Sequence, residues 1–251
     1  MMKNILLLHK KEGETPLEAL LKFRAKNKKY KDTKMTYAGR LDPMASGLLL
    51  VLLGEETKNK EKYLSLDKEY EFQVLFGFAT DTYDILGKVA STKEAIENSK
   101  ELEEKIKDSL KFFTGKFIQK YPMYSSKTVE GKQLFEYARE GKDVEIPERE
   151  VSVKELKFLK IKKISSKKLL ENIERRIAKV KGDFRQKDIL KIWSNKLGKK
   201  SDSFFLGSFV VRCGSGTYVR SIANDVGEKM GIPALAFSIK RTKIGKWRQV
   251  E

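Results

Sequence analysis

Residues 37–58, which read YAGRLDPMASGLLLVLLGEETK, constrain the fold more than any other stretch of the chain. The apolar run at 48–53 is unbroken, which is typical of a strand buried on both faces. Immediately before it, Pro43 restricts Asp42 to extended backbone angles, and Gly39 permits close backbone approach. The pattern predicts a rigid corner that fixes where the Asp42 carboxylate points. The alternative is that Asp42 only caps a turn, as an aspartate before proline often does.

The composition is that of a globular protein, because 40% of the 251 residues are hydrophobic and 35% are charged. A chain of this length can bury a sizeable core as one large domain or two small ones. The apolar runs fall short of the roughly 18 residues that span a bilayer, and residues 1–8 are too short for a signal peptide. We therefore expect a cytoplasmic protein without a membrane partner.

The charge is strongly positive, with 53 Lys and Arg against 35 Asp and Glu, a formal net charge of +18. Such an excess favours a polyanionic partner bound through phosphate contacts, although it also fits a generally lysine-rich proteome. The single cysteine, Cys213, and the single histidine, His9, cannot form a disulfide framework or a Cys/His zinc site. His9 lies at the entry of a basic loop without a nucleophile signature, so we interpret it as a surface residue.

Hydrophobic periodicity predicts a mixed α+β pattern. Alternating residues over 70–78 predict a strand with one buried face, so that Tyr70 starts on the core-facing side. A capping box opens a helix at Pro16, and we expect Leu17, Leu20 and Leu21 to face inward. The other expected helices cover 96–113, 134–139 and 219–230, and the other expected strands cover 5–8, 151–161, 204–213 and 234–239.

Residues 164–203 differ in character from the rest of the chain. Two amphipathic stripes, separated at Gly182-Asp183, predict two helices that form a hairpin. The segment contains nine lysines and three arginines against five acidic residues, a net charge of +7. We expect these cations to face outward, where they either bind nucleic-acid phosphates or form a solvated face without such a contact.

Several motifs resemble those of the TruB family of pseudouridine synthases and occur in the same order. The catalytic motif L-D-P-x-A-x-G-x-L followed by G-x-x-T-K is matched at Leu41-Asp42-Pro43, Ala45, Gly47, Leu49, Gly54, Thr57 and Lys58. Further matches lie at Lys68 to Tyr70, Gly77 to Gly87, Tyr121 to Lys127, Gly131 to Gly141 and Gly216 to Ser221. Together the matches cover most of residues 1–163 and 204–245, so that 164–203 is an insertion relative to the family.

The resemblance implies an α+β pseudouridine synthase fold, with a mixed, mainly antiparallel sheet flanked by helices and an inserted helical hairpin. It also implies an isomerase that converts uridine 55 in the T-loop of tRNA to pseudouridine after flipping the base out of the loop. This reaction detaches uracil from ribose and rejoins it through carbon, so neither a metal nor another cofactor is expected. The expected partner is tRNA, through its T-arm, and we expect the enzyme to be a monomer.

The resemblance assigns the chemistry to a few positions. Asp42 matches the essential carboxylate, which acts as a nucleophile or as a base toward the ribose. Arg220 matches the arginine that pairs with this carboxylate; the alternatives are a phosphate clamp and a solvated helix residue. Tyr70 matches the tyrosine that packs on the base and can move its proton; the alternative is a core tyrosine. The other positions matched to the base pocket or the flipped nucleotide are Tyr37, Tyr218 and Ile239.

Cations outside the catalytic motif are expected to contact the RNA backbone. The candidates are Lys10, Lys127, Arg175, Arg176, Lys199, Lys200 and Arg241. Two departures from the family pattern affect RNA contacts: residues 9–13 read HKKEG instead of D-K-P-x-G, and Tyr37 stands where many bacterial members have histidine. The sequence ends shortly after Trp247, which leaves no room for the C-terminal PUA domain of many members, so we expect a single catalytic domain over 1–251.

Two functions of other classes fit parts of the sequence. Residues 213–217, CGSGT, lie between an expected strand and helix, as in the phosphate-binding turn of a nucleotide-binding enzyme. However, Val219 stands where a dinucleotide fingerprint needs glycine. A non-catalytic basic RNA-binding protein would use the same charge but would give Asp42 and Arg220 no common role.

A third alternative is a pseudouridine synthase that acts on ribosomal RNA. Arg40-Leu41-Asp42 is similar to the R-L-D core of those enzymes, which are expected to share the sheet and the chemistry. The matches at Pro43, Ala45 and residues 121–127 favour the tRNA branch.

Overall fold

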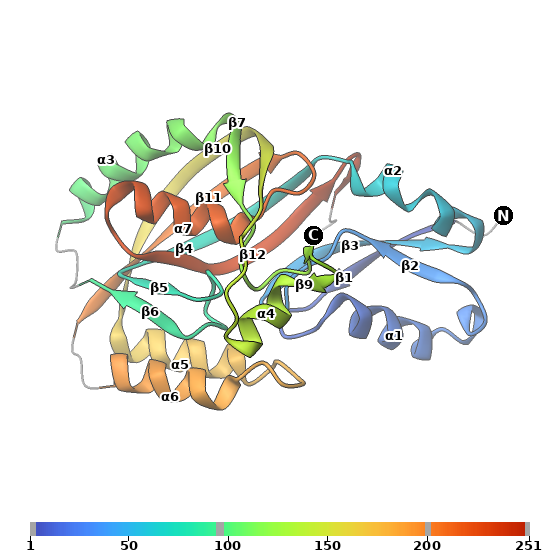
Figure 1. The fold of residues 1–251 in the computed structure, drawn as a ribbon, viewed down its shortest axis with the longest axis horizontal. Coiled ribbons are helices and arrows are strands. Elements are labelled where there is room, and N and C mark those ends of the chain that lie inside the picture. The colour runs from blue at the N-terminus through green and yellow to red at the C-terminus, as the bar shows by residue number, and fades with distance from the viewer. Residues whose placement is uncertain (1–3, 94–97, 199–201, 249–251) are drawn as a thin grey trace.

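The computed structural model describes residues 4–93, 98–198 and 202–248. These residues build a large sheet whose strands are β1 (Ile5–Lys10), β2 (Met35–Ala38), β3 (Ala45–Leu53), β4 (Lys68–Phe76), β7 (Gly115–Lys120), β10 (Glu148–Ser165), β11 (Ser203–Cys213), β12 (Ala234–Ile244) and β13 (Trp247–Arg248) (Figure 1). The path through the sheet runs β1-β3-β12-β4-β11-β10-β7, with β2 added to β3 and β13 added to β12. β4 therefore lies between β12 and β11, two strands from a distant part of the chain.

The strand pairings confirm the predicted α+β class. Within the described residues, neighbouring strands of the large sheet run antiparallel except β3 and β12, which pair in parallel over 45–47 and 239–241. Two small hairpins lie outside this sheet: β5 (Phe78–Thr80) with β6 (Val89–Thr92), and β8 (Thr128–Val129) with β9 (Lys132–Gln133). The sheet is thus mixed and mainly antiparallel, as predicted.

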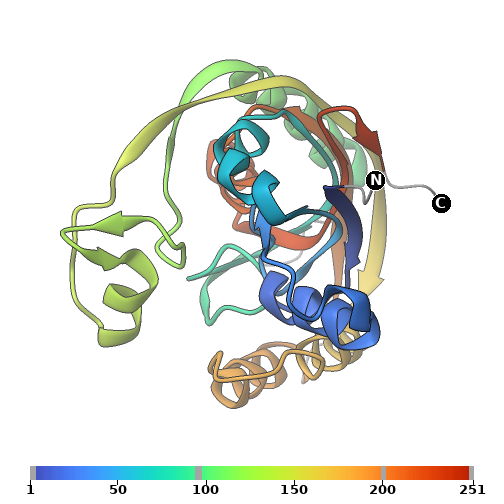
Figure 2. The same ribbon diagram turned by 90° about the vertical axis from the view of Figure 1, so that its right-hand side faces the viewer.

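Helices cover both faces of the sheet. They are α1 (Pro16–Lys26), α2 (Lys60–Leu64), α3 (Ser99–Leu110), α4 (Leu134–Glu140), α5 (Ser166–Ile177), α6 (Gln186–Leu197) and α7 (Val219–Met230), with short 3-10 helices at Lys28–Tyr30, Gly54–Asn59 and Lys111–Phe113. α3 and α7 lie on one face of the central strands and α5 and α6 on the other, as Figure 1 and Figure 2 show. Each face has its own apolar core, the first including Phe72, Ile106 and Ile222, the second including Leu75, Ile173 and Trp193.

α1 begins at the predicted capping box. The Thr15 hydroxyl accepts a hydrogen bond from Glu18 N, and the Glu18 carboxylate accepts one from Thr15 N. The expectation that Leu17 and Leu21 face inward is wrong, because both side chains are exposed. The buried residues of the helix are Pro16, Ala19 and Leu20. The small side chain of Ala19 lets this side of the helix approach β3, and Leu17 and Leu21 therefore lie on the solvent side.

The strand expected over 70–78 begins and ends two residues earlier than predicted, starting at Lys68. It ends at Phe76 as β4, and Phe78 starts β5 in a separate hairpin, because Gly77 turns the chain with a φ of 102°. Tyr70 is buried as predicted, but the expectation of a single buried face is wrong, since Leu75 is fully buried under the inserted helices. The helix expected from 96 is described from Ser99, and Ile96 lies outside the described residues.

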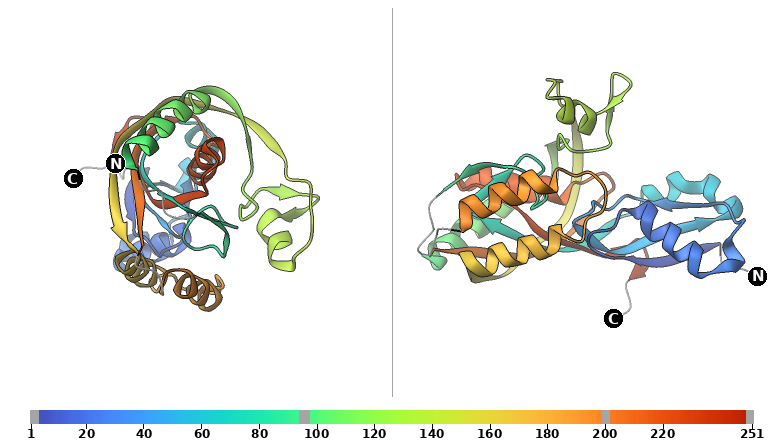
Figure 3. Two further views of the ribbon diagram at one scale, coloured as in Figure 1. Left: turned by 90° about the vertical axis from the view of Figure 1, so that its left-hand side faces the viewer. Right: turned by 90° about the horizontal axis from the view of Figure 1, so that it is seen from below.

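The helical hairpin predicted within 164–203 is confirmed as α5 and α6. Figure 3 shows the two helices side by side on the face of the sheet away from α7. β10 runs further than predicted, to Ser165, whose hydroxyl caps α5 by accepting a hydrogen bond from Lys168 N. The indole of Trp193 donates to the Ile85 carbonyl (3.2 Å), which ties the insertion to the turn between β5 and β6. Residues 178–185, which connect α5 to α6, are called the hairpin loop below.

A second projection, residues 121–147, is called the arm below. It leaves the sheet between β7 and β10, carries the β8–β9 hairpin and α4, and stands away from the body of the molecule (Figure 2). Its α4 side returns toward the hairpin loop, where the Arg139 guanidinium donates to the Asp183 carbonyl (3.1 Å). The arm and the inserted hairpin therefore meet through two residues that are 44 positions apart in the sequence.

Candidate active site

A cleft of about 770 Å³ opens where the β2–β3 turn, the β5–β6 turn, the arm and the start of α7 meet. Asp42 lines it from the corner predicted by the sequence. The Arg220 guanidinium donates two hydrogen bonds to the Asp42 carboxylate, from Nε to Oδ2 (2.7 Å) and from Nη2 to Oδ1 (3.2 Å). The Asp42 side chain is 38% exposed and the Arg220 side chain 3%. A ligand in the cleft can therefore contact the carboxylate, whereas the guanidinium is shielded.

The corner that carries Asp42 is held by Arg241 of β12, which is buried. Its guanidinium donates to the carbonyls of Gly39 (3.1 Å), Arg40 (3.3 Å) and Leu48 (2.8 Å). Gly47 permits this arrangement, because its φ is 110° and a Cβ there would lie 2.3 Å from the Arg241 carbonyl oxygen. β3 and β12 can come together at this point only because residue 47 has no side chain.

A second buried cation, Lys10, supports the other side of the corner. Its ammonium group donates to the carbonyls of Lys11 (2.9 Å), Glu14 (2.5 Å) and Pro43 (3.4 Å). Burial lowers the pKa of Lys10 to about 8. The expectation that Lys10 and Arg241 contact RNA phosphates is wrong, because both side chains are buried and donate to backbone carbonyls. They shape the site from behind.

Arg220 lies in the first turn of α7, where three segments fix its position. Besides its carboxylate partner, it donates from Nη1 to the Thr82 carbonyl and from Nη2 to the Tyr124 carbonyl (3.2 Å). The turn before the helix is held by Gln119 of β7, which accepts from Tyr218 N (2.8 Å) and donates to the Tyr218 carbonyl (3.2 Å). A solvated helix residue and a phosphate clamp are both excluded for Arg220, because its guanidinium is buried and fully engaged.

Asp84 is a further site residue, to which the sequence pattern assigned no role. Its Oδ2 lies 3.9 Å from Arg220 Nε, and its Oδ1 accepts a hydrogen bond from the Thr82 hydroxyl (2.8 Å). Burial raises the pKa of Asp84, although Arg220 opposes the rise. Burial also acts to lower the pKa of Arg220, but Asp42 and Asp84 outweigh it and leave that pKa raised. The signal in the sequence was the T-D-T-x-D pattern at 80–84.

Aromatic and apolar side chains form the wall beside the carboxylate. Tyr70, Tyr218 and Ile239 all line the cleft, as the family resemblance predicted. Burial raises the pKa of Tyr70 and of Tyr218, so both hydroxyls keep their protons at neutral pH. Tyr37 does not join this wall. It pairs with Val51 on β3 and packs on the α1 side of the sheet, because strand alternation turns its ring away from the cleft.

The remaining cation candidates divide into exposed and buried side chains. Lys127 on the arm and Arg175 on α5 are exposed, and residues 199–200 lie outside the described part of the chain. The expectation that Arg176 faces outward is wrong, because it is 5% exposed and donates from Nε to the Glu12 carboxylate (2.8 Å). Its guanidinium carbon also lies 4.7 Å from the centre of the Phe237 ring. Arg176 therefore joins the hairpin to the sheet.

The sequence assigned no role to three other cleft residues, although one of them, Tyr124, lies in the matched segment 121–127. Arg149 of β10 lies against the glycine turn at 213–217, where Gly216 leaves room for its guanidinium. Tyr124 of the arm and Arg185 of the hairpin loop line the same cleft. Arg185 lies in the hairpin loop, outside the family-like segments found in the sequence.

Comparison with known proteins identifies the family. Residues 26–182 match the TruB family pseudouridylate synthase (N terminal domain). The chain belongs to the TruB family. The tRNA pseudouridine synthase B of Ligilactobacillus salivarius (strain UCC118) is 34% identical over 244 residues, which cover 97% of this chain and 68% of that protein. The Aquifex aeolicus (strain VF5) protein of the same name is 31% identical over 243 residues, which cover 97% and 69%. The predicted family and enzyme class are confirmed: this TruB-family chain is a pseudouridine synthase, an isomerase.

Solved structures support the fold of this TruB-family chain. A chain in the crystal structure of a Cbf5-Nop10-Gar1 complex aligns with a TM-score of 0.57 and 20% identity over 98% of this chain. This chain spans about half of that one (50%). A chain of an H/ACA RNP bound to a substrate RNA aligns with a TM-score of 0.54 and 19% identity. At this identity the likeness shows the fold alone. Among the described helices, none is long and apolar enough to cross a bilayer.

Proposed function

We propose that this TruB-family enzyme isomerises uridine 55 in the T-loop of tRNA to pseudouridine. The observation that carries the proposal is the Asp42–Arg220 pair, which provides a partly exposed carboxylate beside an aromatic wall in a single cleft. The relatives named tRNA pseudouridine synthase B support tRNA as the substrate. The net charge of +18 also favours a polyanionic substrate.

In this proposal Asp42 is the reacting carboxylate. It attacks the ribose as a nucleophile or removes a ribose proton as a base, and both routes need its ionised form. Arg220 stabilises that form through two charge-assisted hydrogen bonds from a guanidinium shielded from water. The bond from ribose to N1 of uracil breaks and a bond from the same ribose carbon to C5 forms, while C5 gives up its proton and N1 takes one. No group is gained or lost, so the chemistry requires neither a metal nor a cofactor.

The proposed base pocket consists of Tyr70, Tyr218 and Ile239. A uridine within a folded loop cannot reach Asp42 in place, so it is flipped out at a cost on the order of a few kcal/mol, which stacking and phosphate contacts offset. Tyr70 is assigned the role of packing on the flipped base and moving its proton. Its place in the cleft wall supports the packing role, and its raised pKa means that the hydroxyl meets the base as a proton donor.

The exposed cations are assigned to the RNA backbone. Lys127 projects from the arm and Arg175 from the inserted hairpin, so contacts at these positions would extend the interface beyond the cleft. We assign residues 1–251 to a single pseudouridine synthase domain, with 164–203 as a basic helical insertion. The enzyme is proposed to act as a monomer in the cytoplasm on the T-arm of tRNA.

The test is incubation of the purified chain with an unmodified tRNA transcript, followed by mapping of pseudouridine at single-nucleotide resolution. We expect conversion at position 55 and at no other uridine. Asp42→Asn should abolish conversion while tRNA affinity stays within a few-fold, because one carboxylate carries the chemistry and many cations carry the binding. Turnover by Asp42→Asn would refute the assigned chemistry.

The matched control is Asp67→Asn, which alters a half-exposed carboxylate paired with Lys154 outside the cleft. This variant should convert tRNA at the wild-type rate. A ribosomal RNA transcript serves as the competing substrate, and conversion of that RNA in place of tRNA would assign the enzyme to the other branch. Tight tRNA binding by both variants without any conversion by the wild type would favour a non-catalytic RNA-binding protein.

A further inference from the structure

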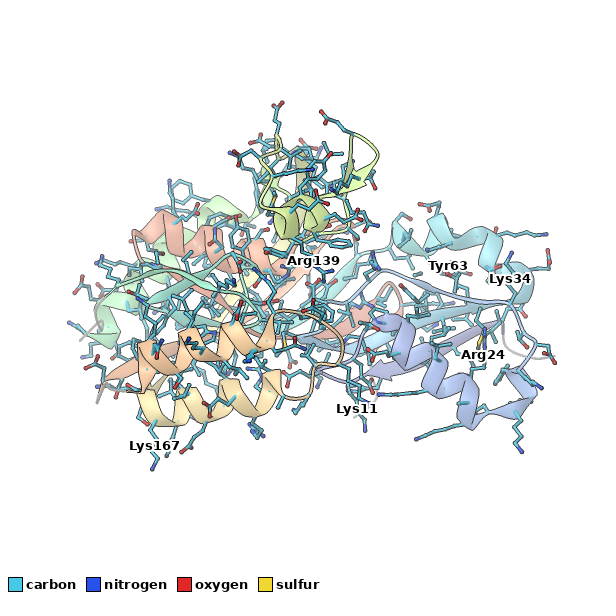
Figure 4. All side chains as sticks on the ribbon, turned by 60° about the horizontal axis from the view of Figure 1, so that its bottom comes forward. Lys11, Arg24, Lys34, Tyr63, Arg139 and Lys167 are labelled. Carbon is cyan, nitrogen blue, oxygen red and sulfur yellow. The ribbon has the colours of Figure 1, made fainter. Side chains whose placement is uncertain are left out.

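The inserted hairpin reaches the active-site cleft through its loop. Phe184 and Arg185, at the end of the hairpin loop, line the cleft together with residues of the family motifs. The arm contacts the same loop through the hydrogen bond from Arg139 to the Asp183 carbonyl. Figure 4 shows Arg139 between the arm and the hairpin. The insertion is therefore part of the cleft wall and not only an outer appendage.

Arg185 makes two contacts that join separate segments. Its Nη1 donates to Asp81 Oδ2 (2.7 Å) and its Nη2 to Asp81 Oδ1 (3.3 Å), and the two side chains are 23% and 31% exposed. Its guanidinium carbon lies 4.3 Å from the centre of the Tyr124 ring, within the range of a cation–π interaction. A single side chain thus connects the β5–β6 turn to the arm.

The hairpin loop holds Arg185 in an unusual backbone conformation. Its φ is 63°, a region that residues other than glycine rarely adopt. Gln186 fastens the loop: its side chain accepts from Phe184 N (2.9 Å) and donates to the carbonyls of Val180 (3.1 Å) and Gly182 (2.8 Å). Strained residues persist where the surroundings determine them strongly, and they concentrate at functional sites.

The two segments joined by Arg185 are those that hold Arg220. Arg220 donates to the carbonyl of Thr82, the residue after Asp81, and to the carbonyl of Tyr124. We propose that Arg185 is a positioning residue that sets these two carbonyl oxygens and thereby orients Arg220 on the reacting carboxylate. This inference deepens the proposed function and rests on it, because it requires the ion pair to carry the chemistry.

The other role for a cation at this place is to bind an RNA phosphate. The geometry favours positioning, because both terminal nitrogens of Arg185 are engaged by Asp81 and one face of its guanidinium is covered by Tyr124. A phosphate would have to compete with an existing two-pronged ion pair for the same donors.

Kinetic parameters separate the two roles. Arg185→Ala should lower kcat about 10- to 100-fold with KM nearly unchanged, since a shift of about 1 Å in a catalytic group can cost roughly 100-fold. A lost phosphate contact would instead raise KM, leave kcat unchanged and reduce the log–log salt slope by about 0.7 to 0.9. That result, or wild-type kinetics, would overturn the inference. Arg185→Lys should recover only part of kcat, because an ammonium keeps the charge but not the two-pronged contact.

A double-mutant cycle with Asp81→Asn tests whether Arg185 affects kcat through Asp81. Asparagine keeps an oxygen that can accept the hydrogen bond from Lys88 N, so the turn retains its closure while the ion pair loses its charge. Asp81→Asn should lower kcat as Arg185→Ala does, and the double variant should lose no more than either single variant. Additive losses would mean that Arg185 does not act through Asp81 and would overturn the inference.

The control for charge is Lys167→Ala, at the exposed far end of the same hairpin (Figure 4). It removes one positive charge and should leave kcat and KM unchanged. Asp42→Asn is measured in parallel, so that a failure of the proposed function can be told apart from a failure of the role assigned to Arg185. Turnover by Asp42→Asn would refute the proposed function, whereas an inactive Asp42→Asn beside a fully active Arg185→Ala would refute only the role of Arg185.

Discussion

Replacing Arg220 by lysine tests the central ion pair, because the change keeps the positive charge and alters only its shape. The guanidinium makes four hydrogen bonds, two to Asp42 and one each to the carbonyls of Thr82 and Tyr124. Three different nitrogens make these bonds, and a single ammonium nitrogen cannot reach all four acceptors. At 3% exposure, the side chain leaves no access for water to replace the lost donors.

The expected loss follows from the bonds that lysine cannot remake. Losing one bond to the Asp42 carboxylate (about 1.5–3 kcal/mol) and one to a backbone carbonyl (about 0.5–1.5 kcal/mol) removes about 2–4.5 kcal/mol. If this energy acts in the transition state, kcat falls roughly 30- to 2,000-fold, since about 1.36 kcal/mol corresponds to a factor of ten. tRNA affinity should stay within a few-fold, because Arg220 lies behind the carboxylate and does not reach the RNA.

The assay is single-turnover pseudouridine formation with enzyme in excess over a tRNA transcript, together with a direct measurement of tRNA binding. The control is Arg212→Lys, which makes the same exchange at an arginine that is 55% exposed and pairs with Glu69; it should leave the rate unchanged. A wild-type single-turnover rate in a folded Arg220→Lys enzyme would refute the reasoning. The orientation of Asp42 would then not depend on the planar guanidinium.

Lys10 should make stability depend on pH: burial lowers its pKa from 10.5 to about 8, so the unfolded chain binds more protons between these values. The free energy of unfolding of the wild type, measured with urea, should therefore rise by up to about 3 kcal/mol relative to that of Lys10→Met as the pH increases through that window. Gly47→Ala should cost more than about 3 kcal/mol, because φ is 110° and the new Cβ meets backbone at 2.3 Å. Gly141→Ala, with a φ of 64° and open space, should cost only about 1–2 kcal/mol. Lys127→Ala with Arg175→Ala should lower the salt slope of tRNA binding by about 0.7 to 0.9 per lost contact, and an unchanged slope would exclude both from the interface.

The structure around Asp42 could be predicted because it depends on neighbours in the sequence. Pro43 restricts the preceding residue, and the apolar run that follows can only be a buried segment, so the corner and β3 are local properties. The same holds for the inserted hairpin, whose two apolar stripes and intervening Gly182 are visible in the sequence. The family motifs extended this prediction to Arg220, which lies 178 residues from its partner.

Only the tertiary structure decided where the positive charge is used. The sequence shows how many cations the chain has, but Lys10, Arg176 and Arg241 are buried because they meet carbonyls or a carboxylate from segments far away in the chain. Tyr37 was likewise assigned by motif position, yet the pairing of β2 with β3 turns its ring toward α1. Arg185 enters the cleft because the hairpin packs against the β5–β6 turn, a contact between elements 104 residues apart. Burial and partner choice depend on such long-range packing, which local sequence patterns do not encode.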